Sequence, residues 1–102
     1  MNEELVSVCF REECLKCYGR FGGQWFVSSV WVSNWKDMTP KALEKWMSCM
    51  FRKCRVDYRI SVVEIRNETI TYHTWETIGV TDIEQVDYQL DEIPSWCKEL
   101  VF

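Results

Sequence analysis

Apolar side chains recur at helical spacing along the middle of the chain. From Thr39 onward they form one stripe, which consists of Leu43, Trp46, Met47, Met50, Phe51 and Cys54. Thr39 is a favoured N-cap residue, and Pro40 suits the first turn because its missing N–H would have no helical partner there. Arg52 and Lys53 complement the negative C-terminal end of the helix dipole. We therefore predict a helix over residues 39–53.

Runs of β-branched and aromatic residues that alternate with polar ones predict strands on both sides of this helix. Two strands precede the helix and three follow it, at residues 5–10, 24–33, 56–65, 69–77 and 86–91. Residues 11–18 are expected to form a helical turn or two, and the glycines in residues 18–23 predict a turn. Strands grouped around one helix predict an α+β domain: an antiparallel sheet of about five strands in the order β-β-α-β-β-β, with the helix on one face.

Four local features add detail to this arrangement. The adjacent Val62 and Val63 shift the alternation of their strand and predict a bulge. Asn67-Glu68 lies between two strand-like runs and predicts a hairpin turn, although Asn-Gly would be a stronger signal. The last run also fits a helix through Ile83, Val86 and Leu90, which is the competing prediction. The C-terminal tail is expected to dock through Trp96 and Phe102.

Length and composition place the chain in a broad class. The 102 residues are 47% hydrophobic and 15% aromatic, which predicts one folded domain spanning residues 1–102 and excludes disorder. No apolar run approaches the roughly 18 residues of a membrane span, so no membrane partner is expected. The N-terminal sequence MNEELVSVCF is acidic, whereas a signal peptide begins with basic residues. We therefore expect the protein to act in the cytoplasm.

Charge is distributed unevenly along the sequence. Residues 67–97 contain seven acidic residues and no lysine or arginine, whereas residues 1–66 hold eleven basic and eight acidic ones. A field of one sign attracts a partner of the opposite sign, and aromatic side chains beside charge are common at binding hot spots. The sequence therefore predicts a binding surface for a basic protein partner, such as a nucleic-acid-binding protein. Its candidate residues are Glu76, Asp82, Glu84, Asp87, Tyr88, Asp91 and Glu92.

Paired cysteines suggest two alternative functions, a metal site and a redox site. Cys14-x-x-Cys17, together with Cys49 and Cys54, has the ligand types of a structural zinc site. Cys49 and Cys54 lie five residues apart at the end of the predicted helix, so their side chains should point in different directions. A thioredoxin-like redox site is the other alternative, but the neighbouring Glu12 and Glu13 would raise a thiol pKa instead of lowering it. We therefore expect unligated, packed thiols and no metal.

Other chemistry has weaker support in the sequence. His73, the single histidine, lies out of phase with Ile70 and Tyr72 and is expected on the outer face of the sheet. The chain has no glycine-rich phosphate loop, and we expect no catalytic residue and no cofactor. The basic segment RKCRVDYR at residues 52–59 is the basis for direct nucleic-acid binding, which a sequence pI near 5.0 makes unfavourable.

These observations favour a small, non-catalytic protein-binding module that acts through an acidic, aromatic-bearing C-terminal sheet. Small single domains of this composition, without an active-site motif, are typical of virus- or phage-encoded inhibitors of host machinery, which would place this one in the host cytoplasm. The alternatives are a zinc-stabilised domain in a nucleic-acid-linked complex and, third, a thiol-redox enzyme. The oligomeric state is not predicted.

Overall fold

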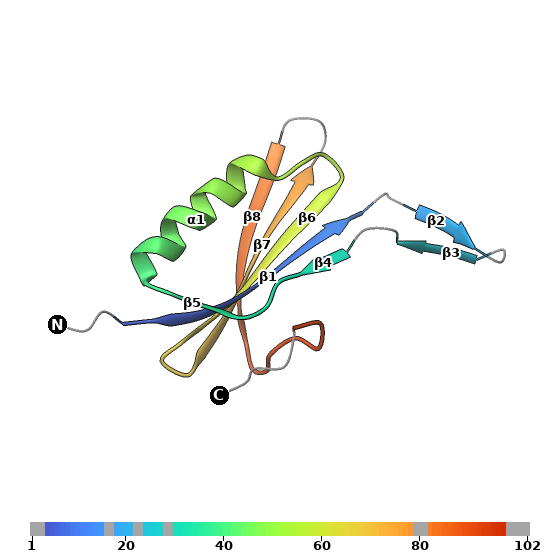
Figure 1. The fold of residues 1–102 in the computed structure, drawn as a ribbon. Coiled ribbons are helices and arrows are strands. Elements are labelled where there is room, and N and C mark those ends of the chain that lie inside the picture. Colours follow the sequence, from blue (N-terminus) through green and yellow to red (C-terminus); the bar gives the residue numbers. More distant parts are fainter. Residues whose placement is uncertain (1–3, 16–17, 22–23, 28–29, 79–81, 98–102) are drawn as a thin grey trace.

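The fold combines one helix with antiparallel strands, as the sequence predicts (Figure 1). The computed structural model describes residues 4–15, 18–21, 24–27, 30–78 and 82–97. Within these residues the elements, in chain order, are β1 (Val6–Cys14), β2 (Tyr18–Phe21), β3 (Gln24–Val27), β4 (Val30–Val32), β5 (Lys36–Met38), α1 (Pro40–Lys53), β6 (Tyr58–Arg66), β7 (Thr69–Ile78) and β8 (Asp82–Leu90).

The main sheet is antiparallel and has the strand order β4-β1-β6-β7-β8. The short strand β5 also pairs with β1, next to β4 and on the same edge. Because β4 and β5 lie end to end, together they cover most of the outer edge of β1. The strands β2 and β3 form a separate hairpin that extends away from the main sheet (Figure 1).

The helix covers one face of the main sheet and forms the principal core with it (Figure 1). Val8, Phe10 and Val62 are buried on that face, together with Ile60 and Trp75. Leu43 fills the helix side of this core, and Trp46, Met47 and Met50 pack around it as the predicted stripe requires. We call this side of the sheet the helix face and the opposite side the second face.

The start of α1 follows from its capping residues. The side-chain Oγ1 of Thr39 accepts a hydrogen bond from the backbone N–H of Ala42 at 3.2 Å, and Pro40 occupies the first turn. The predicted helix is confirmed, and one residue of its stripe differs. Phe51 is exposed instead of buried, because it lies at the side of the helix that faces β8.

The C-terminal tail crosses the second face. Trp96 lies against the guanidinium of Arg11, with the carbon of that group 5.3 Å from the ring centroid. Burial and the neighbouring thiol of Cys9 raise the pKa of Cys97 to about 12. Docking through Trp96 is therefore confirmed, whereas Phe102 lies outside the described residues. The contacts explain why Cys9 is buried although α1 covers the other face.

Several local predictions are wrong. The first strand does not end at Phe10 but continues to Cys14, because the β6 edge pairs with it along residues 7–14. Residues 18–21 form β2 instead of a turn, and the predicted strand over 24–33 is divided into β3 and β4. Pairing with neighbouring strands decides the conformation of these segments. It overrides the preference of the glycines for a turn and the helical spacing of residues 11–18.

The hairpin and the last strand are confirmed, and the bulge is not. Asn67 and Glu68 have φ angles of 48° and 64°, the left-handed conformation that a two-residue hairpin turn requires. Val62 and Val63 keep a regular register with both neighbouring strands. Both are buried because the sheet is covered on its two faces at this point, which removes the reason to expect alternation.

The core can be tested with two leucines of opposite exposure. Leu43 is 2% exposed and Leu5 is 60% exposed. We expect Leu43→Ala to lower the free energy of unfolding by about 2–5 kcal/mol, because it leaves a cavity between α1 and the sheet. Leu5→Ala should change it by less than about 0.5 kcal/mol. Urea denaturation of both variants measures the difference, and equal effects would contradict the described packing.

Candidate functional site

The outer edge of β8 is the most accessible strand edge of the main sheet. β7 pairs with β8 along its whole length, and among the described residues no strand pairs with the other side. Six of the nine residues of β8 are exposed. In an antiparallel strand alternate residues direct their N–H and C=O groups away from the neighbour, so this edge presents free backbone donors and acceptors.

The register divides the predicted binding residues between the two faces. Glu76 and Glu84 are directly opposite each other on the second face, and Asp82 and Tyr88 project to the same side. Asp87 is opposite His73 and therefore lies on the helix face. Asp91 and Glu92 follow the end of β8 and are exposed. The structure thus brings most of the predicted residues to one strand and its end, but it does not place them on one face.

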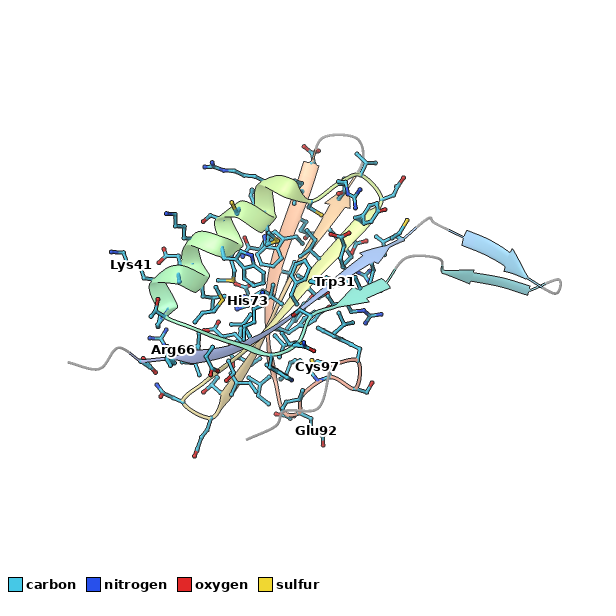
Figure 2. All side chains as sticks on the ribbon, viewed as in Figure 1. Trp31, Lys41, Arg66, His73, Glu92 and Cys97 are labelled. Atoms are coloured by element: carbon cyan, nitrogen blue, oxygen red, sulfur yellow. The ribbon has the colours of Figure 1, made fainter. Side chains whose placement is uncertain are left out.

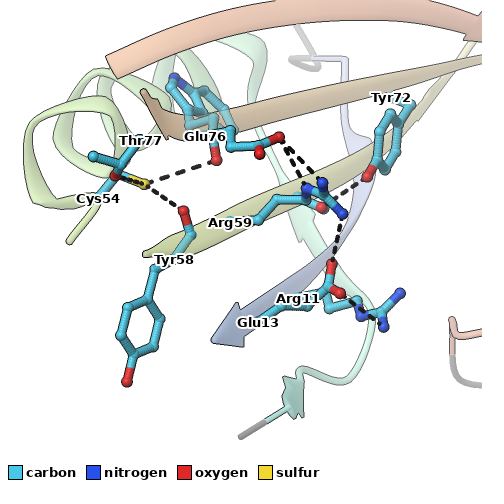
Figure 3. Close-up of polar contacts among 10 residues, drawn as sticks. Arg11, Glu13, Cys54, Tyr58, Arg59, Tyr72, Glu76 and Thr77 are labelled. Atoms are coloured by element: carbon cyan, nitrogen blue, oxygen red, sulfur yellow. Dashed lines mark hydrogen bonds and ion pairs between the residues drawn. The ribbon is translucent and has the colours of Figure 1, made fainter. Parts of the chain in front are cut away.

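Arg59 neutralises part of this negative charge. Its Nη2 lies 3.1 Å from Glu76 Oε2, and its Nη1 lies 3.9 Å from Glu13 Oε1 (Figure 3). Burial lowers the pKa of Arg59, but the hydrogen bond and the charge of Glu76 outweigh burial and raise it. Among the described residues Asp82, Glu84, Asp91 and Glu92 form no ion pair. The charge available to a partner is therefore concentrated on β8 and the residues that follow it.

Tyr88 adds an exposed aromatic surface to the second face. Its ring centroid lies 6.2 Å from that of Tyr72 on the neighbouring strand. The hydroxyl of Tyr72 is 2.8 Å from Ser61 Oγ, which holds the inner ring of the pair in place (Figure 3). Tyr88 itself is 51% exposed, so one side of the pair remains open on the second face. An exposed aromatic face suits a lysine or arginine side chain.

A groove lies between α1 and β8 on the helix face. It has a volume of about 400 Å³ and is lined by Glu44, Met47, Ser48, Phe51, Arg52 and Gln85. Phe51 and Met47 supply its apolar part, and Gln85 comes from the middle of β8. In the sequence Phe51 and Met47 belong to the apolar stripe of the helix, and Gln85 carries no signal of a groove. Only the distance between the helix and the edge strand, which is a tertiary feature, reveals the groove.

His73 is buried on the helix face, so its predicted position on the outer face is wrong (Figure 2). His73 and Tyr72 do project to opposite faces of the sheet, as the alternation predicts. The face that carries His73 is, however, the one that α1 covers. The ring is held between two carboxylates, with Nδ1 2.9 Å from Asp87 Oδ1 and Nε2 2.9 Å from Glu64 Oε2. In the protonated ring both nitrogens donate, one to each carboxylate.

The two carboxylates determine the protonation of His73. Burial alone would lower the pKa of His73, but the hydrogen bonds to Glu64 and Asp87 and their negative charges outweigh burial and raise it. In its protonated form the ring links three neighbouring strands, β6, β7 and β8, by charge. This arrangement explains how Asp87 can lie on the covered face, and it leaves Asp87 as a structural residue as well as a candidate binding residue.

The cysteines of the alternative zinc set do not come together within the described residues. Cys49 is exposed on α1, whereas Cys54 is buried with its Sγ 3.5 Å from the carbonyl of Tyr58 and 3.6 Å from Thr77 Oγ1 (Figure 3). Cys14 is disulfide-bonded, so the prediction of a free thiol is wrong for this residue, and Cys17 lies outside the described residues. No group of three or more metal-binding side chains occurs in the described part of the chain.

The surroundings of Cys14 and of the basic segment bear on the redox and nucleic-acid alternatives. Cys14 ends β1, and the next described element is the strand β2, whereas a thioredoxin-like site requires a helix there. In the basic segment 52–59, Arg55 pairs with Glu12 at 3.0 Å and lies over the ring of Tyr58 at 4.2 Å. Arg59 is paired as described above. Two of the four basic side chains are thus occupied by other groups of the protein.

Comparison with protein-family models, with curated proteins and with solved structures finds no match for this chain. In the described residues, α1 is too short to span a bilayer, and no helix is both long and apolar enough to do so.

The linkage between His73 and folding predicts a pH dependence. Because the pKa of His73 is raised above 6.5 in the folded state, its contribution to stability is complete below about pH 6.5 and is lost as the pH rises through the folded pKa. We expect the wild type to lose its advantage over His73→Gln as the pH rises above about 6.5. Urea denaturation at a series of pH values measures this. His73 is the single histidine, so parallel profiles for the two proteins would contradict the charged triad.

Proposed function

We propose that this protein is a non-catalytic binding module in which the outer edge of β8 accepts an extended, basic segment of another protein as an additional strand. The observation that carries the proposal is a nine-residue edge strand, largely exposed, with carboxylates and no cationic residue. Strand addition provides affinity through backbone hydrogen bonds and specificity through alternate side chains. This mode uses the acidic stretch without requiring that its residues share one face.

The two faces beside β8 define what the partner strand should carry. On the helix face its side chains would enter the groove, where Met47 and Phe51 suit apolar residues of moderate size and the charged Glu44 and Arg52 form the rest of the helix side with Ser48. On the second face its side chains would lie beside Glu84 and the exposed ring of Tyr88, which suits lysine or arginine. The preferred partner segment therefore alternates apolar and basic residues.

Charge disfavours a second copy of this chain as the occupant. Pairing two β8 edges would bring Asp82, Glu84 and Asp87 of one copy toward the same residues of the other. Charged side chains on an edge strand commonly prevent such self-association. The acidic residues of β8 would repel a second copy of this chain, but they would attract a basic segment of a different protein. We therefore propose a heterologous partner.

The proposed biological role is inhibition, which would result from covering the partner's basic segment. A protein that covers a basic, extended segment competes with any other ligand of that segment, and nucleic-acid-binding proteins carry such segments. We therefore propose an inhibitory role against a basic protein, in keeping with a virus- or phage-encoded factor. A factor of this kind would act in the host cytoplasm.

The proposed recognition can be tested with a short labelled peptide of alternating valine and lysine. We expect it to bind with an affinity that falls as salt is added, whereas a peptide of alternating valine and glutamate should not bind. Glu84→Lys should weaken binding by about fivefold or more, because it reverses a charge beside the added strand. Glu92→Lys makes the same change of charge beyond the end of β8 and should weaken binding less than about twofold. Fluorescence anisotropy measures all four affinities.

Backbone methylation of the same peptide tests strand addition itself. In an extended strand, the N–H groups of alternate residues point to opposite sides. Methylating the valine nitrogens in one peptide and the lysine nitrogens in another should therefore abolish binding of one peptide and spare the other. Equal binding of the two methylated peptides, or equal effects of the two charge reversals, would refute strand addition at β8.

A further inference from the structure

A second hollow of the surface lies on the other side of α1, far from β8 in the strand order. It has a volume of about 330 Å³ and is lined by Val8, Phe10, Trp31, Ser33, Lys36, Met38, Trp46 and Met50. These residues come from β1, from α1 and from the segment that covers the outer edge of β1. We call this hollow the aromatic pocket. It contains none of the residues of the β8 edge and is independent of the function proposed above.

Three aromatic rings form the wall of the aromatic pocket. The ring of Phe10 lies between those of Trp31 and Trp46, with centroid distances of 5.2 Å and 5.5 Å. Trp31 is 57% exposed, which is unusual for so large a ring, and it stands at the open side on β4 (Figure 2). Met38 and Met50 add flexible apolar surface that adjusts to the shape of a ligand. The wall thus favours a flat or elongated apolar molecule.

Lys36 supplies the charge at the aromatic pocket. It is opposite Val8 in the register and projects to the helix face, whereas the next residue, Asp37, projects to the second face and accepts a hydrogen bond from Ser7 Oγ at 3.2 Å. Glu64 lies across β1 from Lys36 in the same row but is held by His73. Within the described part of the chain, no ion pair involves Lys36. Its ammonium group is therefore available to an anion.

The other polar side chain of the lining is already satisfied. Ser33 Oγ accepts a hydrogen bond from the backbone N–H of Phe10 at 2.9 Å and donates to the carbonyl of Asn34 at 3.0 Å. The lining contains no acidic residue, so the aromatic rings are not arranged for a cationic ligand. The polar selectivity of the aromatic pocket thus depends on Lys36.

We infer that the aromatic pocket binds a small apolar carboxylic acid, with its ring or chain against Trp31, Phe10 and Trp46 and its carboxylate paired with Lys36. Its volume lies within the range of about 300–1,000 Å³ that is typical of small-molecule sites. An apolar cavity of about 150 Å³ holds one benzene molecule, so the aromatic pocket is large enough for two fused rings or a chain of similar size. The carboxylate remains at the open side, where water completes its hydration.

The test uses 2-naphthoate and two compounds of nearly the same shape, 2-naphthalenemethanol and protonated 2-naphthylmethylamine. We expect 2-naphthoate to bind in a one-to-one complex and to shift the indole N–H resonances of Trp31 and Trp46 in isotope-labelled protein, while that of the buried Trp75 stays unchanged. The alcohol should bind about tenfold more weakly, because it carries no negative charge to pair with the ammonium group of Lys36, and the amine more weakly still. Nuclear magnetic resonance titration measures all three affinities.

Variants of two exposed residues complete the test. Lys36→Met should abolish the preference for the acid over the alcohol, and Lys36→Arg should retain it. Trp31→Ala should weaken binding of both compounds without unfolding the protein, because Trp31 lies outside the buried core. The inference is overturned if 2-naphthoate does not bind at millimolar concentration, if the shifts occur elsewhere than at Trp31 and Trp46, or if Lys36→Met keeps the preference.

Discussion

The backbone N–H and C=O groups along the edges of the main sheet must find partners, and the rest of the structure depends on how each edge meets this requirement. At the β1 edge, β5 pairs with residues 6–8 and β4 with residues 11–13. At the β8 edge no described strand does so. The asymmetry gives the sheet one closed edge and one accessible edge, and each of them lies beside a different side of α1.

This arrangement relates the two proposed sites to one core. Leu43 fixes α1 over the middle of the sheet, which leaves a hollow on each side of the helix. On the closed side Trp31 and Lys36 border the aromatic pocket, and on the open side Phe51 and Gln85 border the groove beside β8. The charged triad of His73 ties β8 to the interior strands from the helix face. The same packing therefore holds the edge strand in place and leaves its outer side accessible.

Predictions from the sequence succeeded where a local signal determines the conformation. Thr39 and Pro40 mark the start of α1, and Asn67-Glu68 adopts the left-handed turn that closes a hairpin. Predictions failed where tertiary contacts decide. His73 has the alternation of an outward residue, but α1 covers the face on which it lies. The acidic stretch was visible in the sequence, whereas its division between two faces, the groove beside Phe51 and the aromatic pocket required the register and the position of the helix.

Amide hydrogen exchange along β8 in the free protein tests most directly whether this edge is accessible. Amides that point toward β7 should exchange slowly, and those of the alternate residues, which point outward, should exchange at rates close to those of exposed loops. The account predicts this alternation from Asp82 to Leu90. Uniformly slow exchange along the strand would show that the edge is already covered and would contradict the account.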